Sequence, residues 1–291
     1  MEYTLKNKKL TVVFESKGAT LHSIKDNDGV EYLWEGNPEY WSGQAPVLFP
    51  ICGSIRDDKA QIGNRKQTNM PRHGVVRKKE FKCVEQTENS ILFEIESNEE
   101  MLAQYPYEFK LGINYILEGK KITTRYIIEN KDKEIMPFQI GGHPGFHCPL
   151  YKEESYEDYE LVFEQKETCT VPTPETGLID MEHRSEFLKD TDTLPLKHDL
   201  FSVDAVILDQ LKSRAVTLKS KKHNKGIRID FNQFPYLILW STAKEADFVA
   251  LEPWIGLSTC SDEGDKFEEK RNIQYAQAGE VKEYEFHINI L

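Results

Sequence analysis

The stretch FKLGINYILEGKKITTRYIIEN, residues 109–130, decides the fold class of this chain. In its first half the apolar side chains stand at every second position, at Phe109, Leu111, Ile113 and Tyr115. The alternation resumes over residues 122–128, after a turn signal at Glu118-Gly119. A period of two is typical of a half-buried strand, because successive side chains of a strand point to opposite faces. Two such segments joined by a Gly-containing turn predict a β-hairpin.

Short runs of the same kind recur along the chain, at residues 10–14, 91–95, 161–163, 216–218, 227–231, 236–240 and 284–288. Residues 98–104 have the pattern of one short helix, which ends before Pro106. Strand after strand with turn signals between them predicts an all-β protein, a sandwich or barrel with few short helices. No linker or internal repeat divides the chain, so we expect a single domain over residues 1–291. We expect surface loops at 152–158 and 173–192, and a hairpin tip at the basic run 219–225.

Charge and cysteine usage exclude several classes of protein. The 291 residues contain 37 Lys and Arg against 49 Asp and Glu, a formal net charge of −12. A nucleic-acid groove or an anionic membrane surface requires a positive field, so we expect neither partner. No apolar run approaches the roughly 18 residues that span a bilayer, and the first residues lack the apolar segment of a signal peptide. Five scattered cysteines with no Cys-x-x-Cys pair predict reduced thiols in a cytoplasmic protein, with neither a disulfide framework nor a zinc site.

Polar groups gather in four segments that we expect to be loops: residues 49–58 with 70–77, 139–147, 203–208 and 251–256. They place His or Glu beside Pro and Gly, where the backbone is fixed and a side chain can be aimed into a cleft. The candidates for a polar site are His73, His143, Asp204 and Glu252, with Trp254 as an aromatic platform. His and Glu together suit acid–base chemistry near neutral pH. An aromatic ring beside a carboxylate suits a sugar, whose C–H faces stack while its hydroxyls form hydrogen bonds.

Rival interpretations of the same residues are less favourable. His143 and His147 have the spacing of two metal ligands on a helix, but Gly142, Pro144 and Gly145 preclude a helix there. Cys148 is a nucleophile only if neighbours lower its pKa, and its default is a small buried side chain. The Gly141-Gly142 pair lacks the following helix of a phosphate cradle. We therefore expect no metal and no cofactor.

At these segments the sequence resembles the aldose 1-epimerase (galactose mutarotase) family, and most closely its LacX-like branch. Five motifs of that family match in order and over almost the full chain. They are residues 50–54 with 72–77 (PICGS and RHGVVR), 141–146 (GGHPGF), 203–207 (VDAVI), 234–240 (FPYLILW) and 252–256 (EPWIG). Each motif alone is short and forgiving, whereas five in order at the family's spacing are specific.

The resemblance implies a large antiparallel β-supersandwich whose concave face holds a pyranose. It implies that Glu252 is the general base on the anomeric hydroxyl and that His143 is the general acid on the ring oxygen. An ionised Glu252 is then expected to raise the pKa of His143. His73 and Asp204 hold hydroxyl groups and the ring oxygen, and no cofactor is needed.

The family's substrate-binding arginine falls on Ser54 in this chain. Our hypothesis is that Arg56, on the same face of an extended segment, replaces it. Arg77 and Trp254 complete the expected set of sugar-binding residues. The resemblance thus predicts an isomerase that interconverts the α and β anomers of a free hexose such as galactose or glucose, as a monomer or homodimer.

Three alternatives remain open. Relatives that act on hexose 6-phosphates require an arginine cluster, which Arg56, Arg72 and Arg77 could supply. A non-catalytic carbohydrate-binding or sensor protein could use the same fold. A glycosidase requires two carboxylates across a scissile bond, which Asp204 and Glu252 could supply.

Overall fold

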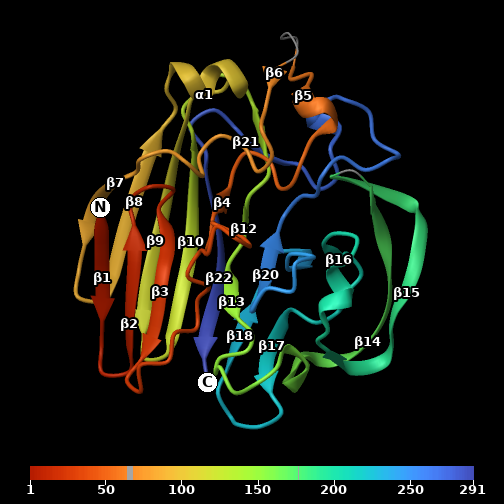
Figure 1. Cartoon of the computed structure of the whole chain (residues 1–291). Coiled ribbons are helices and arrows are strands. Elements are labelled where there is room, and N and C mark those ends of the chain that lie inside the picture. The colour runs from red at the N-terminus through yellow and green to blue at the C-terminus, as the bar shows by residue number, and fades with distance from the viewer. Residues whose placement is uncertain (64–67, 176) are drawn as a thin grey trace.

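The computed structural model describes residues 1–63, 68–175 and 177–291, and antiparallel strands make up most of it. A nine-stranded sheet forms one layer (Figure 1). In spatial order it consists of β15 (Leu178–Pro195), β14 (Tyr159–Glu175), β17 (Ala215–Ser220), β18 (Gly226–Asp230), β22 (Val281–Ile290), β10 (Lys121–Asn130), β9 (Phe109–Glu118), β8 (Ser90–Glu96) and β7 (Lys82–Gln86).

A six-stranded sheet lies against this layer. Its strands are β16 (Val206–Leu208), β19 (Tyr236–Trp240), β20 (Phe248–Trp254), β12 (Gly141–Gly142) and β4 (Val47–Leu48), with β13 (Gly145–His147) also paired to β20. The two sheets approach closely at Gly142, where an added Cβ would stand 2.9 Å from the hydroxyl oxygen of Tyr126 and 2.9 Å from Cε1 of Phe286. Glycine at this position therefore lets the small sheet lie directly on β10 and β22.

Smaller elements complete the molecule. A three-stranded sheet contains β1 (Glu2–Lys6), β2 (Leu10–Glu15) and β3 (Thr20–Asp26), and two-stranded pairs are formed by β5 (Lys59–Ala60) with β6 (Thr68–Asn69) and by β11 (Met136–Phe138) with β21 (Gln274–Ala276). The helices are α1 (Glu99–Gln104) and the 3₁₀ turns Arg56–Asp58, Tyr156–Asp158, His198–Phe201 and Phe267–Glu269. No helix in the described part of the chain is long and apolar enough to cross a membrane.

The predicted fold class is confirmed, and so are the elements that decided it. The hairpin of residues 109–130 is β9 paired with β10, with Phe109 opposite Asn130 and Glu118 opposite Lys121. The predicted helix is α1, whose N-terminus is capped by the Asn98 side chain, which accepts a hydrogen bond from the Met101 N–H at 3.0 Å. The basic run 219–225 ends β17, forms the turn before β18 and is a hairpin tip as expected.

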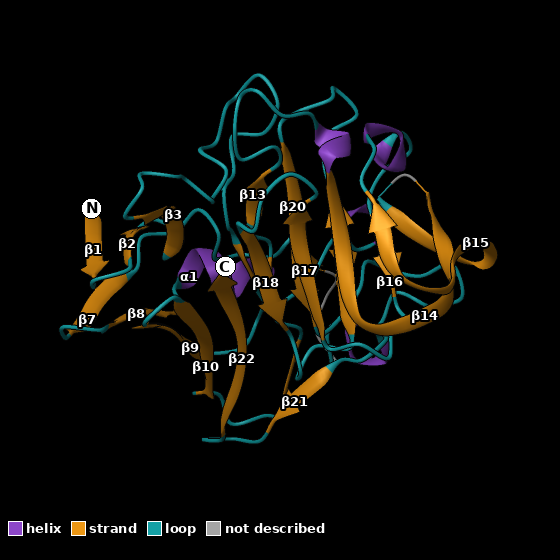
Figure 2. Cartoon of the chain, turned by 90° about the horizontal axis from the view of Figure 1, so that it is seen from below, coloured by secondary structure: helices purple, strands orange, loops and turns teal. Residues whose placement is uncertain are grey.

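Four segments that we expected to be loops contain strands. Residues 173–192 belong largely to the β14–β15 hairpin, which curves around β16 (Figures 1 and 2). Their composition is polar because β15 is an edge strand, and an edge strand exposes polar side chains to solvent. Residues 139–147 contain the short strands β12 and β13. Residues 206–208 and 251–254 lie in β16 and β20, because the apolar runs around them are buried on both faces of the six-stranded sheet.

Candidate active site

A buried carboxylate and a buried imidazole meet at the centre of the six-stranded sheet. Glu252 lies in β20 opposite Ile238 of β19, and its residue is 1% exposed. His143 follows β12, which pairs with β20 at Gly141 and Trp254. Because the two strands are neighbours, Nε2 of His143 stands 3.3 Å from Oε2 of Glu252. The sheet register therefore builds an acid–base pair from residues 109 positions apart in the sequence.

His73 enters the same site on an unusual backbone conformation. Its φ is +66° and that of Gly74 is +80°, both in the left-handed region that side chains rarely adopt. Two hydrogen bonds hold this turn, from the His73 N–H to the Gly53 carbonyl at 2.7 Å and from the Gly74 N–H to the Pro71 carbonyl at 2.9 Å. Strain of this kind is typical of functional sites.

His73 faces a donor at each ring nitrogen. The Gly53 N–H donates to Nδ1 at 3.1 Å, and the Nε–H of Arg72 donates to Nε2 at 3.2 Å. Burial, with the charges of His143, Arg72 and Arg77, holds the pKa of His73 well below its usual range, so the ring is neutral. A neutral imidazole has only one acceptor nitrogen, so the ring can accept only one of these two hydrogen bonds in full.

A narrow cavity of about 30 Å³ opens beside this cluster. It is lined by Arg72, Pro174, Gly177, Leu178, Ile179, Asp204, Ala205, Ile207, Ile238, Trp254 and Ser258. Asp204 reaches it from the segment before β16, and its carboxylate accepts the Ala205 N–H at 2.8 Å. The outer wall is the end of the β14–β15 hairpin.

Three buried polar side chains of this cluster retain hydrogen-bonding capacity. Among the described residues, Nδ1 of His143, Oε2 of Glu252 and Nε1 of Trp254 are buried and form no aligned hydrogen bond, although Trp254 lies close enough to Glu252 to lower the pKa of its carboxyl. An unpaired buried polar group costs free energy, and folded proteins rarely leave several of them together.

Burial controls the protonation of the pair. It raises the pKa of Glu252 well above its ordinary value, and the Arg72 charge only partly opposes this. It lowers the pKa of His143 to about 3, with Arg72 and Arg77 acting in the same direction. We expected the pKa of His143 to rise beside an ionised Glu252, and that expectation is wrong. Loss of water around the ring is the largest cause, and because the pKa of Glu252 is raised, that group is not an ionised partner for the ring.

Comparison with known proteins places the site in a family. Residues 1–273 match the family model described as aldose 1-epimerase. The chain belongs to the aldose 1-epimerase family. It is 49% identical to Protein LacX (plasmid) of Lactococcus lactis subsp. lactis over 100% of both chains.

Two solved structures share its fold across the whole chain. A galactose mutarotase related enzyme from Lactobacillus acidophilus has a TM-score of 0.95 at 29% identity, covering 100% of this chain and 97% of that one. A galactose mutarotase-like protein from Lactobacillus casei has a TM-score of 0.89 at 29% identity, covering 100% of both.

Within this epimerase fold most of the residues singled out from the sequence lie together. The rings of His73 and His143 are 5.6 Å apart, and those of His73 and Trp254 are 5.7 Å apart. Asp204 stands at the cavity and adds to the raised pKa of Glu252. Arg77 is half-buried, and its charge lowers the pKa of both imidazoles. Cys148 is fully buried, which raises the pKa of its thiol and fits the default interpretation.

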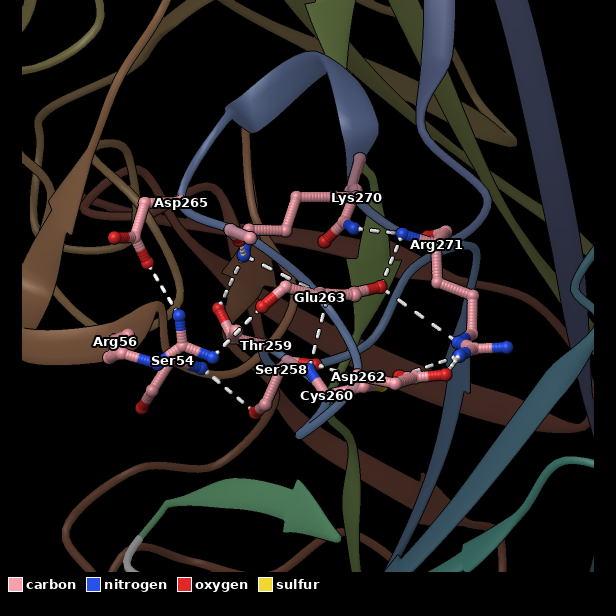
Figure 3. Close-up of polar contacts among 12 residues, drawn as sticks. Ser54, Arg56, Ser258, Thr259, Cys260, Asp262, Glu263, Asp265, Lys270 and Arg271 are labelled. Atoms are coloured by element: carbon pink, nitrogen blue, oxygen red, sulfur yellow. Dashed lines mark hydrogen bonds and ion pairs between the residues drawn. The ribbon is translucent and has the colours of Figure 1, made fainter. Parts of the chain in front are cut away.

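Arg56 is not brought to this cluster. Its guanidinium donates to Asp265 at 2.6 Å and to the Glu263 carbonyl at 3.0 Å (Figure 3). Ser54, by contrast, is joined to a residue that lines the cavity, because its N–H donates to Ser258 Oγ at 2.9 Å. The geometry therefore gives no support to Arg56 as the replacement for the family arginine, and Arg72 is the arginine that the fold places against His73.

From the sequence, Arg72 was expected only as part of a possible phosphate-binding cluster, although it stands directly before His73 in a quoted motif. Trp41 and Trp240, whose rings contact His143, were not expected in the site. Adjacency to His73 could have indicated Arg72. Nothing local could have indicated Trp41, because its contact with His143 spans about a hundred residues of chain.

Proposed function

We propose that this protein is an aldose 1-epimerase that interconverts the α and β anomers of a free hexose such as galactose or glucose. The observation that carries the proposal is the 3.3 Å contact between Glu252 and His143 in a buried, under-hydrogen-bonded site. Membership of the family and the supersandwich fold support it. The burial of four of the five cysteines as free thiols further supports our proposal of a cytoplasmic setting.

The proposed reaction requires one base and one acid at the anomeric centre. The carboxylate of Glu252 takes the proton of the C1 hydroxyl, whose oxygen forms the aldehyde C=O. The electron pair of the C1–O5 bond moves to O5, which takes the proton from Nε2 of His143. Rotation about C1–C2 presents the other carbonyl face, and the same two groups reverse the transfers when the ring closes. A base and an acid placed in this way contribute on the order of 10²- to 10⁴-fold each.

The pair must hold one proton for this scheme to work. Burial favours the neutral form of both groups, and it therefore places that proton on Glu252. Catalysis with Glu252 as base requires the proton on His143, so sugar binding has to move it. The 3.3 Å separation allows direct transfer between Oε2 and Nε2. Sugar hydroxyls that hydrogen-bond to the ionised forms supply the driving force.

The remaining residues orient the sugar in this proposal. The His73 ring forms a hydrogen bond with a sugar oxygen, Asp204 accepts from a hydroxyl, and the indole of Trp254 lines the cavity. Because the cavity is smaller than a pyranose, we also propose that the end of the β14–β15 hairpin moves outward when the sugar enters.

A hexose 6-phosphate is the second candidate substrate, and one observation favours it. Arg72 and Arg77 lie close enough for the Arg72 charge to lower the pKa of Arg77. Within the described residues neither guanidinium is paired with a carboxylate. Two such cations without counter-ions are suited to a phosphate group.

The first test is anomer exchange measured by NMR on equilibrium mixtures of galactose, glucose and other aldoses. We expect the protein to accelerate exchange, and Glu252→Gln, which keeps the shape and removes the base, to lower the rate by about 10²-fold or more. A Glu252→Gln variant with wild-type turnover would show that the base is a different group. No acceleration on free or phosphorylated aldoses would leave the sugar-binding interpretation.

The phosphate alternative is tested on the same instrument with glucose 6-phosphate and galactose 6-phosphate. If the phosphate is bound by the arginine pair, Arg77→Ala should raise KM for the phosphorylated sugar by about tenfold or more, and by a clearly larger factor than KM for the free sugar. Arg228→Ala is the matched control, because that arginine pairs with Glu164 and Asp230 on the nine-stranded sheet. Equal KM values for the phosphorylated sugar in Arg77→Ala and in the wild type would reject a phosphate-binding role for the arginine pair.

A further inference from the structure

A tryptophan outside every quoted motif stacks on His143. The ring centroids of Trp41 and His143 are 4.8 Å apart with an interplanar angle of 27°. The same indole stacks on Phe248 at 5.3 Å and 26°. Trp240 stands nearly perpendicular to both Trp41 and His143, at 82° and 81°. The imidazole is thus enclosed by one aromatic face and one aromatic edge.

The segment between β3 and β4 holds this indole in a fixed place. The Trp41 carbonyl accepts the indole N–H of Trp34 at 2.8 Å, and the Trp41 N–H donates to the Asn37 carbonyl at 2.8 Å. Two glycines leave room for the ring. A Cβ at Gly145 would stand 2.8 Å from Cζ3 of Trp41, and one at Gly43 would stand 2.6 Å from its Cε2. Contacts this short are not tolerated, so a side chain at Gly145 would displace the indole.

We propose that Trp41 is a positioning residue that fixes the plane of the His143 imidazole and keeps water from it, so that Nε2 stays directed at Glu252. The inference rests on the proposed epimerase function. Nδ1 of His143 has no aligned hydrogen bond to another described residue, and its polar contact is with the backbone of His143 itself, so no neighbouring polar group fixes the plane of the ring on that side. Stacking on Trp41 takes over this task. This packing also explains why a glycine stands at position 145 of the GGHPGF motif, because a side chain there would collide with the indole of Trp41.

The test compares Trp41→Ala, Trp41→Phe and Gly145→Ala with the wild type. Misplacement of a catalytic group by about 1 Å costs on the order of 10²-fold, so Trp41→Ala and Gly145→Ala should lower kcat by about that factor with little change in KM. Trp41→Phe retains a flat ring and should keep most of the activity. Tyr40→Ala is the matched control, because Tyr40 lies in the same segment and contacts Trp34 rather than His143.

A second readout does not depend on catalysis. The pKa of His143, followed by ¹⁵N NMR of the imidazole, should rise from about 3 toward its ordinary value in Trp41→Ala, because water then reaches the ring. Glu252, His73, Arg72 and Arg77 are the titratable and charged groups around His143, and all four are retained in every variant. An unchanged kcat and an unchanged His143 pKa in both Trp41→Ala and Gly145→Ala would overturn the inference. Absence of anomer exchange in the wild type would instead reject the proposed function, and the His143 titration would still decide the role of Trp41.

Discussion

Glu252 and His143 illustrate how burial, rather than residue type, sets protonation. In water a carboxylate and an imidazole near pH 6 would form an ion pair. In this site the desolvation of both groups favours the neutral forms, so the pair holds a single proton over a wide pH range. Glu252 and His143 are thus held in a state from which the transfer of one proton would give the carboxylate and the imidazolium that the proposed reaction requires.

The pH dependence of turnover follows from these shifts. On the acidic side the pair gains a second proton only as the pH approaches about 3, the lowered pKa of His143. On the alkaline side it loses its proton at the raised pKa of Glu252. We therefore expect kcat/KM, which reports the pKa values of the free enzyme, to show no acidic limb near pH 6.5 and to fall as the pH is raised, measured by NMR exchange in buffers from pH 5 to 10. An acidic limb centred near 6.5 would mean that His143 titrates as an exposed imidazole.

The end of the β14–β15 hairpin forms one wall of the cavity. Pro174, Gly177 and Leu178 line this wall, whereas Glu252 lies in β20 and His143 follows β12 of the six-stranded sheet. An edge strand such as β15, with register shifts against β14, is less constrained than a central strand. The outward movement that we propose for sugar entry is therefore placed where the sheet is least constrained.

A cross-link tests this division. A Cβ at Gly177 would stand 3.9 Å from Cβ of Ser54, within the range of a disulfide. We expect Ser54→Cys combined with Gly177→Cys to be inactive when oxidised, because the sugar cannot enter, and to regain activity on reduction. Each single variant controls for the strain of a side chain at the positive φ of Gly177. Full activity of the oxidised protein would show that the sugar enters without movement of the hairpin end.

At the scale of the whole molecule the buried site reduces stability. The two histidines have pKa values below 6.5 in the folded state, so the unfolded chain binds their protons first as the pH falls, and stability decreases between about pH 6.5 and 3. Glu252 acts in the opposite sense. Its raised pKa means that the unfolded chain ionises first as the pH rises above about 4.5, and stability is then lost.

Thermal unfolding checks this linkage. We expect the Tm of the wild type to fall as the pH is lowered from 7 to 4, with a smaller fall in His143→Asn. We expect Glu252→Gln to raise the Tm at pH 8, because it removes a buried acid that the unfolded state ionises, while it abolishes turnover. A Glu252→Gln variant that is less stable at pH 8 would contradict the raised pKa.

The sequence by itself determined the all-β class, the β9–β10 hairpin, the capped helix and the family, because alternation, caps and motif order are local signals. It also supplied His73, His143 and Glu252 as candidates. The contact of Arg72, rather than Arg56, with His73 and the stacking of Trp41 on His143 could be seen only in the tertiary structure. The same holds for the pKa of His143, which burial lowers although a rise was expected. These features depend on contacts between strands distant in the chain and on the exclusion of water, and neither is written in the local pattern of residues.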